Sequence, residues 1–305
     1  MLRTFLAVMI VLGFLFISIA PCPAAETAAP EKAPAAKAGG APELPSAPAI
    51  DAAMKDPNHK VGFIRKTLRL KDGTERIYQV WVPLDYTADK KWPVILFLHG
   101  AGECGTDGEK VLIQGLPKEI RKRDGKFEFI VVIPQCESMR PKEPAPEAAK
   151  EAPKAKGDRF GGRWGWIDAQ EELVMAALAA TLKEYSCDTD REYLTGLSMG
   201  GFGTYLLALK YPKEFVALVP ICGGGDTGRA KEFADIPIWI WHGDADKTVP
   251  VDRSRKMVEA LKAAGAKELK YTEVPDVGHN SWDNTYASDE LWTWLLNHRR
   301  SAAVK

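Results

Sequence analysis

The pattern of hydrophobic and polar positions predicts a β-hairpin at the start of the folded part of the chain. Residues 61–70 and 76–82 alternate with period two, and Lys71-Asp72-Gly73 between them has the composition of a turn. Two later runs, 93–98 and 127–133, are hydrophobic without alternation. Continuous runs of this length are typical of strands that are buried on both faces of a sheet.

Strands and helices alternate along the rest of the chain. We expect strands at 192–194, 215–221, 236–241 and 269–274, and helices at 109–122, 169–185, 200–211, 252–264 and 288–297. This order predicts an α/β fold, in which a mostly parallel twisted sheet carries helices on both faces and begins with an antiparallel N-terminal hairpin.

The N-terminus has the features of an export signal. Arg3 precedes sixteen uncharged, mostly apolar residues, 5–20, and Ala24-Ala25 offers a cleavage point. A membrane span needs about 20 residues, so this run is short for one. We therefore predict a signal peptide at 1–25, export to the periplasm or the medium, and no transmembrane domain after cleavage. An uncleaved signal that tethers the protein to the membrane is the alternative.

The composition changes again after the signal. Residues 26–55 are rich in Ala and Pro and predict a disordered linker, and 56–300 predict one folded catalytic domain. A second stretch of this composition, 141–157, predicts a low-complexity loop insertion inside that domain. It begins just past a predicted strand, so it is either a mobile flap over the site or a solvated spacer.

Charge and cysteine content exclude some function classes. The chain has 41 Lys and Arg residues and 41 Asp and Glu residues, scattered along it, so we expect no nucleic acid as a partner. Cys104, Cys136, Cys187 and Cys222 contain no C-x-x-C element, so we expect no metal site. In an exported protein these four are either disulfide-bonded or small buried thiols, and the sequence ranks neither the pairings nor the oligomeric states.

Ser198 is the strongest chemical candidate in the chain. It lies at the centre of Gly196-Leu197-Ser198-Met199-Gly200, directly after a predicted strand and before a predicted helix. A serine at such a turn has strained backbone angles, and the flanking glycines leave room for it. The turn places the hydroxyl at a helix N-terminus, where backbone N–H groups point outward. This context predicts a nucleophile elbow.

A serine nucleophile needs a base and an acid, and in this layout they follow it along the chain. Of the five histidines, His279 lies in a loop after the last predicted strand, which makes it the expected base. Asp244 and Asp246 both follow the strand 236–241, and Asp226 is a more distant candidate for the acid. We favour Asp246.

Two backbone donors should stabilise the oxyanion of a tetrahedral intermediate. The N–H of Met199, next to the nucleophile, is the expected first donor. The loop after strand 93–98 contains several glycines that permit a close approach, and Ala101 is the expected second donor, with Gly102 as the alternative. We expect His99 to organise this loop by hydrogen bonding.

These segments together resemble the phospholipase/carboxylesterase and dienelactone-hydrolase-like branch of the α/β-hydrolases, and in particular secreted bacterial esterases also called "predicted peptidases" of the prolyl oligopeptidase superfamily. The segments that carry the resemblance, within residues 76–297, are His99-Gly100-Ala101-Gly102-Glu103, Pro134-Gln135-Cys136, Thr195-Gly196-Leu197-Ser198-Met199-Gly200-Gly201, Val219-Pro220-Ile221-Cys222-Gly223-Gly224-Gly225-Asp226, His242-Gly243-Asp244-Ala245-Asp246 with Val249-Pro250, and Gly278-His279. In that family the acid stands three residues before Val-Pro, which selects Asp246. This chain departs from the family at Cys104 and in the insertion 141–157.

The resemblance implies acyl transfer through an acyl-enzyme without metal or organic cofactor. Only residues 223–235 lie where many hydrolases insert a helical cap, so we expect no large cap domain and an open site. The expected substrate is a small-molecule or polysaccharide-borne ester, such as an acetyl or feruloyl ester. We expect Gln135, Trp166 and Trp282 to contact it, with Trp164 as a further part of an aromatic wall; packing under a loop is the alternative for each tryptophan.

Two other functions stay open at this point. The first is a serine peptidase of the prolyl oligopeptidase superfamily, although the N-terminal region is too short for the propeller domain that gates such enzymes. The second is a non-catalytic hydrolase fold that binds carbohydrate. A binding module has no need of Ser198, His279 and an acid together, so we favour an esterase.

Overall fold

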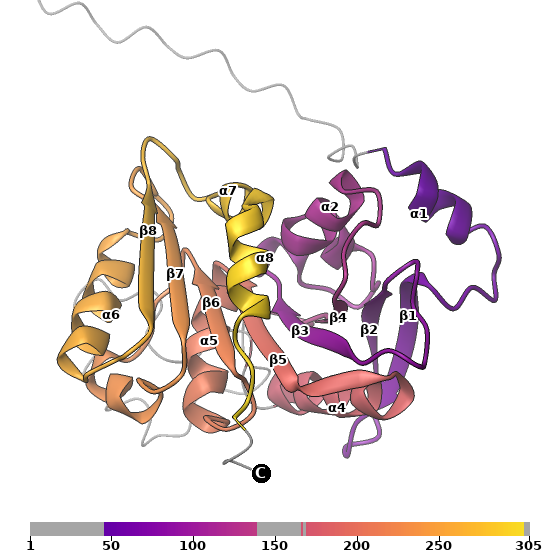
Figure 1. The fold of residues 1–305 in the computed structure, drawn as a ribbon, viewed down its shortest axis with the longest axis horizontal. Helices are drawn as coiled ribbons and strands as arrows, with labels where there is room; N and C mark the ends of the chain where they lie inside the picture. The colour runs from indigo at the N-terminus through magenta and orange to yellow at the C-terminus, as the bar shows by residue number, and fades with distance from the viewer. Residues whose placement is uncertain (1–45, 139–165, 167–168, 302–305) are drawn as a thin grey trace, which may run out of the picture. The chain divides into compact units, whose positions relative to one another are not determined.

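The computed structural model describes residues 46–138, 166 and 169–301. Within these residues eight strands form one sheet in the order β1-β2-β4-β3-β5-β6-β7-β8 (Figure 1). The strands are β1 (Gly62–Arg69), β2 (Glu75–Val82), β3 (Trp92–Leu98), β4 (Ile130–Pro134), β5 (Cys187–Leu197), β6 (Ala217–Ile221), β7 (Ile238–Gly243) and β8 (Leu269–Val274).

The sheet is antiparallel at one edge and parallel elsewhere. β2 pairs antiparallel with both β1 and β4, and every other pair, from β4 through β3 to β8, is parallel. The predicted α/β fold with an N-terminal hairpin is therefore confirmed. Because the carboxyl ends of parallel strands meet at one edge, the loops after β3, β5, β7 and β8 gather there, which is where α/β sheets build their sites.

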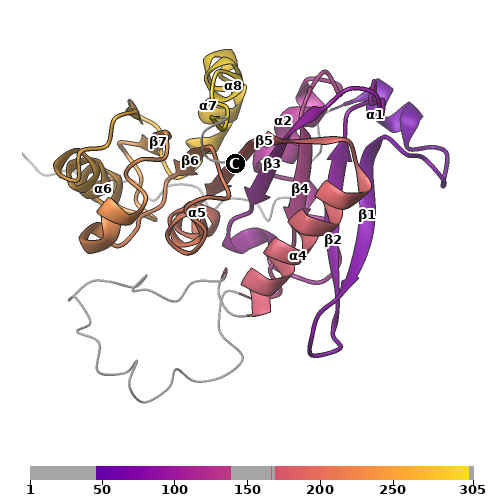
Figure 2. The ribbon, with the colours of Figure 1, turned by 60° about the horizontal axis from the view of Figure 1, so that its bottom comes forward.

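Helices cover both faces of the sheet (Figures 1 and 2). The helices α4 (Ala169–Glu184), α5 (Met199–Lys210) and α6 (Asp252–Ala263) pack on one face, and α1 (Pro48–Ala53), α2 (Gly115–Lys122), α7 (Trp282–Ala287) and α8 (Asp289–Leu296) on the other. Each face of the sheet has its own hydrophobic core, and alternate residues of a strand point into one core or the other. In β3, Leu96 and Leu98 face the first set of helices, and Ile95 and Phe97 face the second. Three short 3₁₀ segments, η1 (Ala101–Glu103), η2 (Lys110–Leu112) and η3 (Thr227–Glu232), lie in loops.

Some elements differ from the sequence-based expectation. The single helix expected at 109–122 is divided into η2 and α2. Gly115, the first residue of α2, has φ 64°, and a Cβ there would lie 2.4 Å from Leu197 Cδ2, so this position requires glycine. β5 begins at Cys187, earlier than the expected 192, and α7 was not predicted.

The folded part also begins earlier than expected. α1 lies within the range 26–55 that we assigned to a disordered linker. Ile50 is fully buried in the same hydrophobic core as residues of α2 and α8, and Asp51 forms an ion pair of 2.8 Å with Arg121. The backbone N–H of Ala49 also donates to Asp124 Oδ1 at 2.9 Å, so a buried side chain and polar contacts together hold this short helix on the domain. This corrects the boundary between linker and domain.

Other expectations fall on residues that lie outside those described. They are the signal peptide at 1–25, the linker up to residue 45 and the insertion at 141–157. Among the described helices, none combines the length and the apolar character that a membrane crossing requires.

Candidate active site

Ser198 lies at a sharp turn between β5 and α5. Its φ and ψ are 53° and −115°, a conformation that is costly for a residue with a Cβ. The flanking glycines make the turn possible: a Cβ on Gly196 would lie 2.3 Å from the carbonyl oxygen of Gly200, and one on Gly200 would lie 1.9 Å from that of Leu98. The strand, the turn and the helix together form the geometry of a nucleophile elbow.

The structure brings Ser198 into a hydrogen-bonded chain with His279 and Asp246. His279 Nε2 lies 2.9 Å from Ser198 Oγ, and its Nδ1 lies 2.7 Å from Asp246 Oδ2. The other two candidate acids lie elsewhere. Asp244 is exposed, and Asp226 caps η3 by accepting a hydrogen bond from the backbone of that segment.

Asp246 is held as a carboxylate. Its side chain is fully buried, and burial alone would raise its pKa. Hydrogen bonds from His242, from His279 and from the backbone of Val249 outweigh burial and hold the pKa well below its usual range. Oδ1 also accepts from the N–H of Thr248 at 2.8 Å. An ionised Asp246 accepts the Nδ1–H of His279, which leaves Nε2 free to accept the proton of Ser198.

His242 is a partner of the acid that the sequence analysis did not assign to the site. It is fully buried at the end of β7, with Nε2 3.2 Å from Asp246 Oδ2 and 2.9 Å from the carbonyl oxygen of Val249. Its Nδ1 lies 2.7 Å from Ser254 Oγ. Since both partners of Nε2 are acceptors, Nε2 carries the proton and Nδ1 accepts from the serine hydroxyl. A histidine at a strand end, four residues before the acid, is the sequence signal for this contact.

The two expected oxyanion donors belong to segments next to Ser198: Met199 follows it in the chain, and Ala101 is in the loop after β3. Met199 is the first residue of α5, so its N–H has no partner within the helix. Ala101 is the first residue of η1, directly after Gly100. A Cβ on Gly100 would lie 3.6 Å from Ser198 Cβ, which puts this loop against the nucleophile. The alternative donor, Gly102, is one residue further along η1.

His99 organises the loop that precedes η1. Its Nδ1 donates to the carbonyl oxygen of Gly100 at 2.6 Å, and its Nε2 accepts from the N–H of Cys136 at 2.9 Å. Burial lowers its pKa to about 4, so the ring is neutral near pH 7. These contacts agree with the structural role that we expect for this residue.

Gln135 does not have the free amide that a substrate contact would need. Its Nε2 donates to the carbonyl oxygen of Glu103 at 3.0 Å and to Asp107 Oδ1 at 3.1 Å, and its Oε1 accepts from the N–H of Gly108 at 2.6 Å. Both amide hydrogens are therefore used inside the protein. Gln135 braces the loop 103–108, which corrects our expectation that it binds substrate.

The expected tryptophans have different surroundings. Trp166 is fully buried with its ring edge-on to His99 at 4.8 Å, so it packs in the core and does not form an exposed wall. Trp282 is partly exposed, and its ring lies 5.4 Å from that of His279 at 86°. Trp164 lies outside the described residues. Among the described tryptophans that we expected at the site, only Trp282 therefore lies beside Ser198, His279 and Asp246, which we call the triad.

Cys222 lies behind the triad. Its Sγ, a carboxylate oxygen of Asp246 and a ring nitrogen of His279 are within 4.8 Å of one another, a set of donors that a metal ion such as Zn²⁺ can use. However, Asp246 and His279 already hydrogen-bond each other, and the second ring nitrogen faces Ser198. The donors fit proton transfer to and from a serine better than metal ligation.

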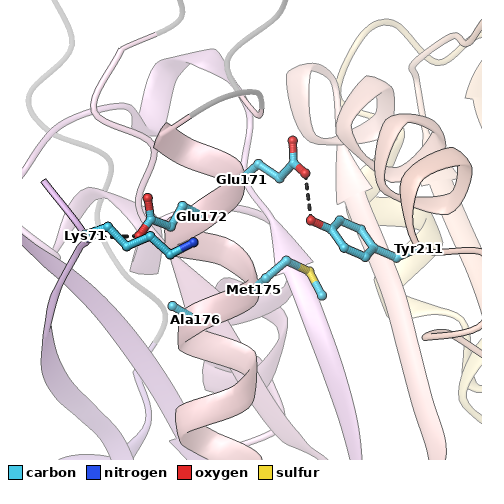
Figure 3. Close-up of a pocket in the computed structure, with 6 residues that line it drawn as sticks. All are labelled: Lys71, Glu171, Glu172, Met175, Ala176 and Tyr211. Atoms are coloured by element: carbon cyan, nitrogen blue, oxygen red, sulfur yellow. Dashed lines mark hydrogen bonds between the residues drawn. The ribbon is translucent and has the colours of Figure 1, made fainter.

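A separate surface pocket of about 430 Å³ contains no residue of the triad (Figure 3). Its walls come from α4, from the turn between β1 and β2, and from the residue after α5; they are Lys71, Glu171, Glu172, Met175, Ala176 and Tyr211. The Tyr211 hydroxyl donates to Glu171 at 2.7 Å, and the backbone N–H of Lys71 donates to Glu172 at 2.9 Å. Both carboxylates therefore have partners within the protein.

Comparison with known proteins agrees with this geometry. Residues 73–222 match a family model described as "Putative esterase". The chain is 30% identical over 228 residues to an endo-1,4-beta-xylanase/feruloyl esterase of Xylanibacter ruminicola, covering 70% of this chain and 28% of that protein. It is 39% identical over 112 residues to a bifunctional acetylxylan esterase/xylanase of Neocallimastix patriciarum, covering 37% of this chain and 16% of that protein. The chain thus spans less than a third of either relative.

Solved structures show the same architecture. A thermostable esterase superposes with a TM-score of 0.65 at 32% identity, over 78% of this chain and 63% of that one. The ferulic acid esterase of Anaeromyces mucronatus, in complex with ferulic acid, superposes with a TM-score of 0.53 at 20% identity, over 73% and 86% of the two chains, which is a likeness of fold. With its strand order and its nucleophile elbow, the chain has the α/β-hydrolase fold, and its sequence is similar to that of esterases.

Proposed function

We propose that the protein hydrolyses carboxylic esters through an acyl-enzyme formed on Ser198. The observation that carries this proposal is the hydrogen-bonded chain from Ser198 Oγ through His279 to Asp246, with distances of 2.9 and 2.7 Å. The match to an esterase family model and the likeness to a thermostable esterase support the reaction class.

In the proposed reaction, Ser198 Oγ attacks the ester carbonyl while His279 Nε2 takes the hydroxyl proton. The anionic Asp246 stabilises the imidazolium that forms. The N–H groups of Met199 and Ala101 receive the negative charge that develops on the carbonyl oxygen. Collapse of the tetrahedral intermediate expels the alcohol, which takes its proton from His279.

The second half of the reaction uses the same groups. His279 Nε2 removes a proton from water, the water oxygen attacks the acyl carbon, and the proton then returns to Ser198 Oγ as the acid leaves. The neutral His99 holds the loop that carries Ala101, and Gln135 braces the segment that follows it. Both residues therefore support the site without touching the reacting atoms.

We further propose that the substrate is an acetyl or feruloyl ester carried by a polysaccharide, and that the protein acts after export. The names of two relatives, an acetylxylan esterase and a feruloyl esterase, support this class of substrate. Trp282 offers an aromatic surface beside His279 that suits a phenolic acyl group. The apolar segment near the N-terminus supports export.

A panel of substrates tests this proposal. Methyl ferulate, acetylated xylo-oligosaccharide, p-nitrophenyl octanoate and a proline-containing peptide anilide are compared at equal enzyme concentration. We expect turnover of one or both of the first two, and none of the anilide. Hydrolysis of the anilide at a higher kcat/KM than any ester would instead make the protein a peptidase.

A further inference from the structure

Two of the cysteines lie side by side at the active-site edge of the sheet. None of the four cysteines of the described residues is in a disulfide bond. Cys104 follows η1 and Cys136 follows β4, and the two thiols lie close enough for each to shift the pKa of the other. The Cys136 thiol donates to the carbonyl oxygen of Ser138 at 3.1 Å. The other two have different surroundings: the thiol of Cys187 is directed at the carbonyl oxygen of Thr181, and Cys222 lies behind the triad.

The main chain holds the two segments together independently of the thiols. The N–H of Gly105 donates to the carbonyl oxygen of Cys136 at 3.0 Å, and the N–H of Cys136 donates to His99 Nε2 at 2.9 Å. Cys104 lies between these two attachment points along its own segment. A disulfide requires the two Cα atoms to be about 4.4–6.8 Å apart with their Cβ atoms facing. The hydrogen bond between Gly105 and Cys136 places the backbone next to Cys104 directly beside Cys136, at a separation where this requirement can be met without a change of fold.

We propose that Cys104 and Cys136 form a disulfide bond when the protein meets an oxidising environment. Export, which the N-terminal segment supports, would bring the protein into such an environment. The oxidant is any small or protein disulfide. The thiolate of Cys104 attacks one of its sulfurs and expels the first thiolate; Cys136 then loses its proton, attacks the Cys104 sulfur and expels the second. Two protein thiols are oxidised, the oxidant is reduced to two thiols, and the two protons released are available to the expelled thiolates.

The surroundings of the two cysteines support this order of attack. Cys104 is partly exposed, and its contact with Cys136 lowers its pKa, so it is the accessible nucleophile. Cys136 is fully buried, and its contact with Cys104 together with burial raises its pKa. A large oxidant reaches Cys104 first, and Cys136 resolves the mixed disulfide from inside the protein.

The bond would fasten the loop of the proposed oxyanion donor Ala101 to the end of β4. It closes the segment 104–136 and so restricts the unfolded chain, which stabilises the folded state. Because the thiols are already close together, we expect the position of Ala101 to change little. The expected effect is a rise in Tm of roughly 5–10 °C, with kcat for a small ester unchanged within about twofold.

The test exposes the full-length protein to a mixture of oxidised and reduced glutathione. Remaining thiols are then alkylated, and peptides are analysed by mass spectrometry without reduction. We expect one cross-linked peptide pair, Cys104 with Cys136, with Cys187 and Cys222 both alkylated. Cys104→Ser should abolish the cross-link and the rise in Tm, and Cys187→Ser, the matched control, should preserve both.

Several results would overturn the proposal. They are full alkylation of Cys104 and Cys136 after oxidation, a stable glutathione adduct on Cys104, or pairing of either residue with another cysteine. Because the readout is a covalent bond, the result stands whether or not the protein proves to be an esterase.

Discussion

His242 Nε2 lies 3.2 Å from Asp246 Oδ2, the same oxygen that accepts the hydrogen bond from His279. One buried carboxylate oxygen is therefore held by two imidazoles. His242 touches neither Ser198 nor the space in front of it in any described contact, so we assign it as a positioning residue for the acid.

Replacing His242 separates positioning from general stability. His242→Gln keeps an N–H donor within reach of Asp246, whereas His242→Leu removes it. A hydrogen bond to a charged group contributes about 1.5–3 kcal/mol, so we expect kcat of the Leu variant to fall by roughly 10- to 100-fold. KM should change little in either variant, and the Gln variant should recover most of kcat. Equal losses in both variants, at equal Tm, would contradict this role.

The acid of the triad can be identified by two matched substitutions. Asp246→Asn removes the charge that stabilises the His279 imidazolium, and we expect kcat to fall by about 10⁴-fold. Asp244→Asn alters an exposed side chain two residues away, and kcat should stay within about twofold. Steady-state kinetics on p-nitrophenyl acetate measures both. A larger loss in the Asp244 variant would contradict the hydrogen bonding in the structure.

Trp282 tests whether the acyl group is aromatic. Its ring lies edge-on to His279, where a phenolic acyl group can pack against it. We expect Trp282→Ala to lower kcat/KM for methyl ferulate by about tenfold and for p-nitrophenyl acetate by less than twofold. Trp282→Phe keeps an aromatic ring and should lie between the Ala variant and the wild type. Equal losses on both esters would mean that the ring supports His279 and does not contact substrate.

Glu192 in β5 gives the fold a pH dependence that is separate from the reaction. It is 4% exposed, and within the described residues its Oε2 has no hydrogen-bond partner. Burial raises its pKa from 4.5 to about 7. The nearby carboxylates Glu214, Asp188 and Asp190 act in the same direction, and Arg300 acts against them. The folded protein therefore keeps this proton to higher pH than the unfolded chain does.

This shift destabilises the fold as pH rises. Below about pH 4.5 both states are protonated, and between about 4.5 and 7 the unfolded state loses its proton first. The free energy of unfolding should fall across that window by up to about 3 kcal/mol from this group. The Tm of Glu192→Gln minus that of the wild type should therefore be larger at pH 8 than at pH 5. Glu259→Gln, on the exposed face of α6, is the control, and its Tm difference from the wild type should be the same at both pH values. For Glu192→Gln, the same Tm difference at both pH values would contradict the assignment.

The fold and the triad could be predicted from the sequence because their signals are local. Continuous hydrophobic runs indicate buried parallel strands, and Gly196 and Gly200 flank a turn at which a Cβ on either glycine would clash with backbone. The order of the loops along the chain then leaves few choices for the base and the acid. His279 follows from that order, whereas the order leaves Asp244 and Asp246 both possible, and the family resemblance, with the acid three residues before Val-Pro, selects Asp246.

Burial and pairing across the fold could not be predicted in the same way. Gln135 and Trp166 occur in segments that border the site, yet the amide of one braces a loop and the ring of the other lies in the core. Likewise the sequence shows His242 only as a polar residue near the end of a strand. The structure is needed to show that the loop after this strand brings the Asp246 carboxylate back into contact with the His242 ring. Ile50 in α1 is surrounded in the sequence by Ala, Pro and polar residues, so no pattern of apolar positions indicates that its side chain is part of the core.

The most direct test of the central claim is covalent labelling of the nucleophile. The full-length wild type and Ser198→Ala are treated with a fluorophosphonate, digested and analysed by mass spectrometry, and turnover of p-nitrophenyl acetate is measured before and after treatment. We predict one adduct on the Ser198 peptide, loss of turnover in step with labelling, and a fall in kcat of at least about 10⁴-fold in the variant. Labelling of another residue, or equal turnover in the variant, would contradict a serine hydrolase mechanism at Ser198.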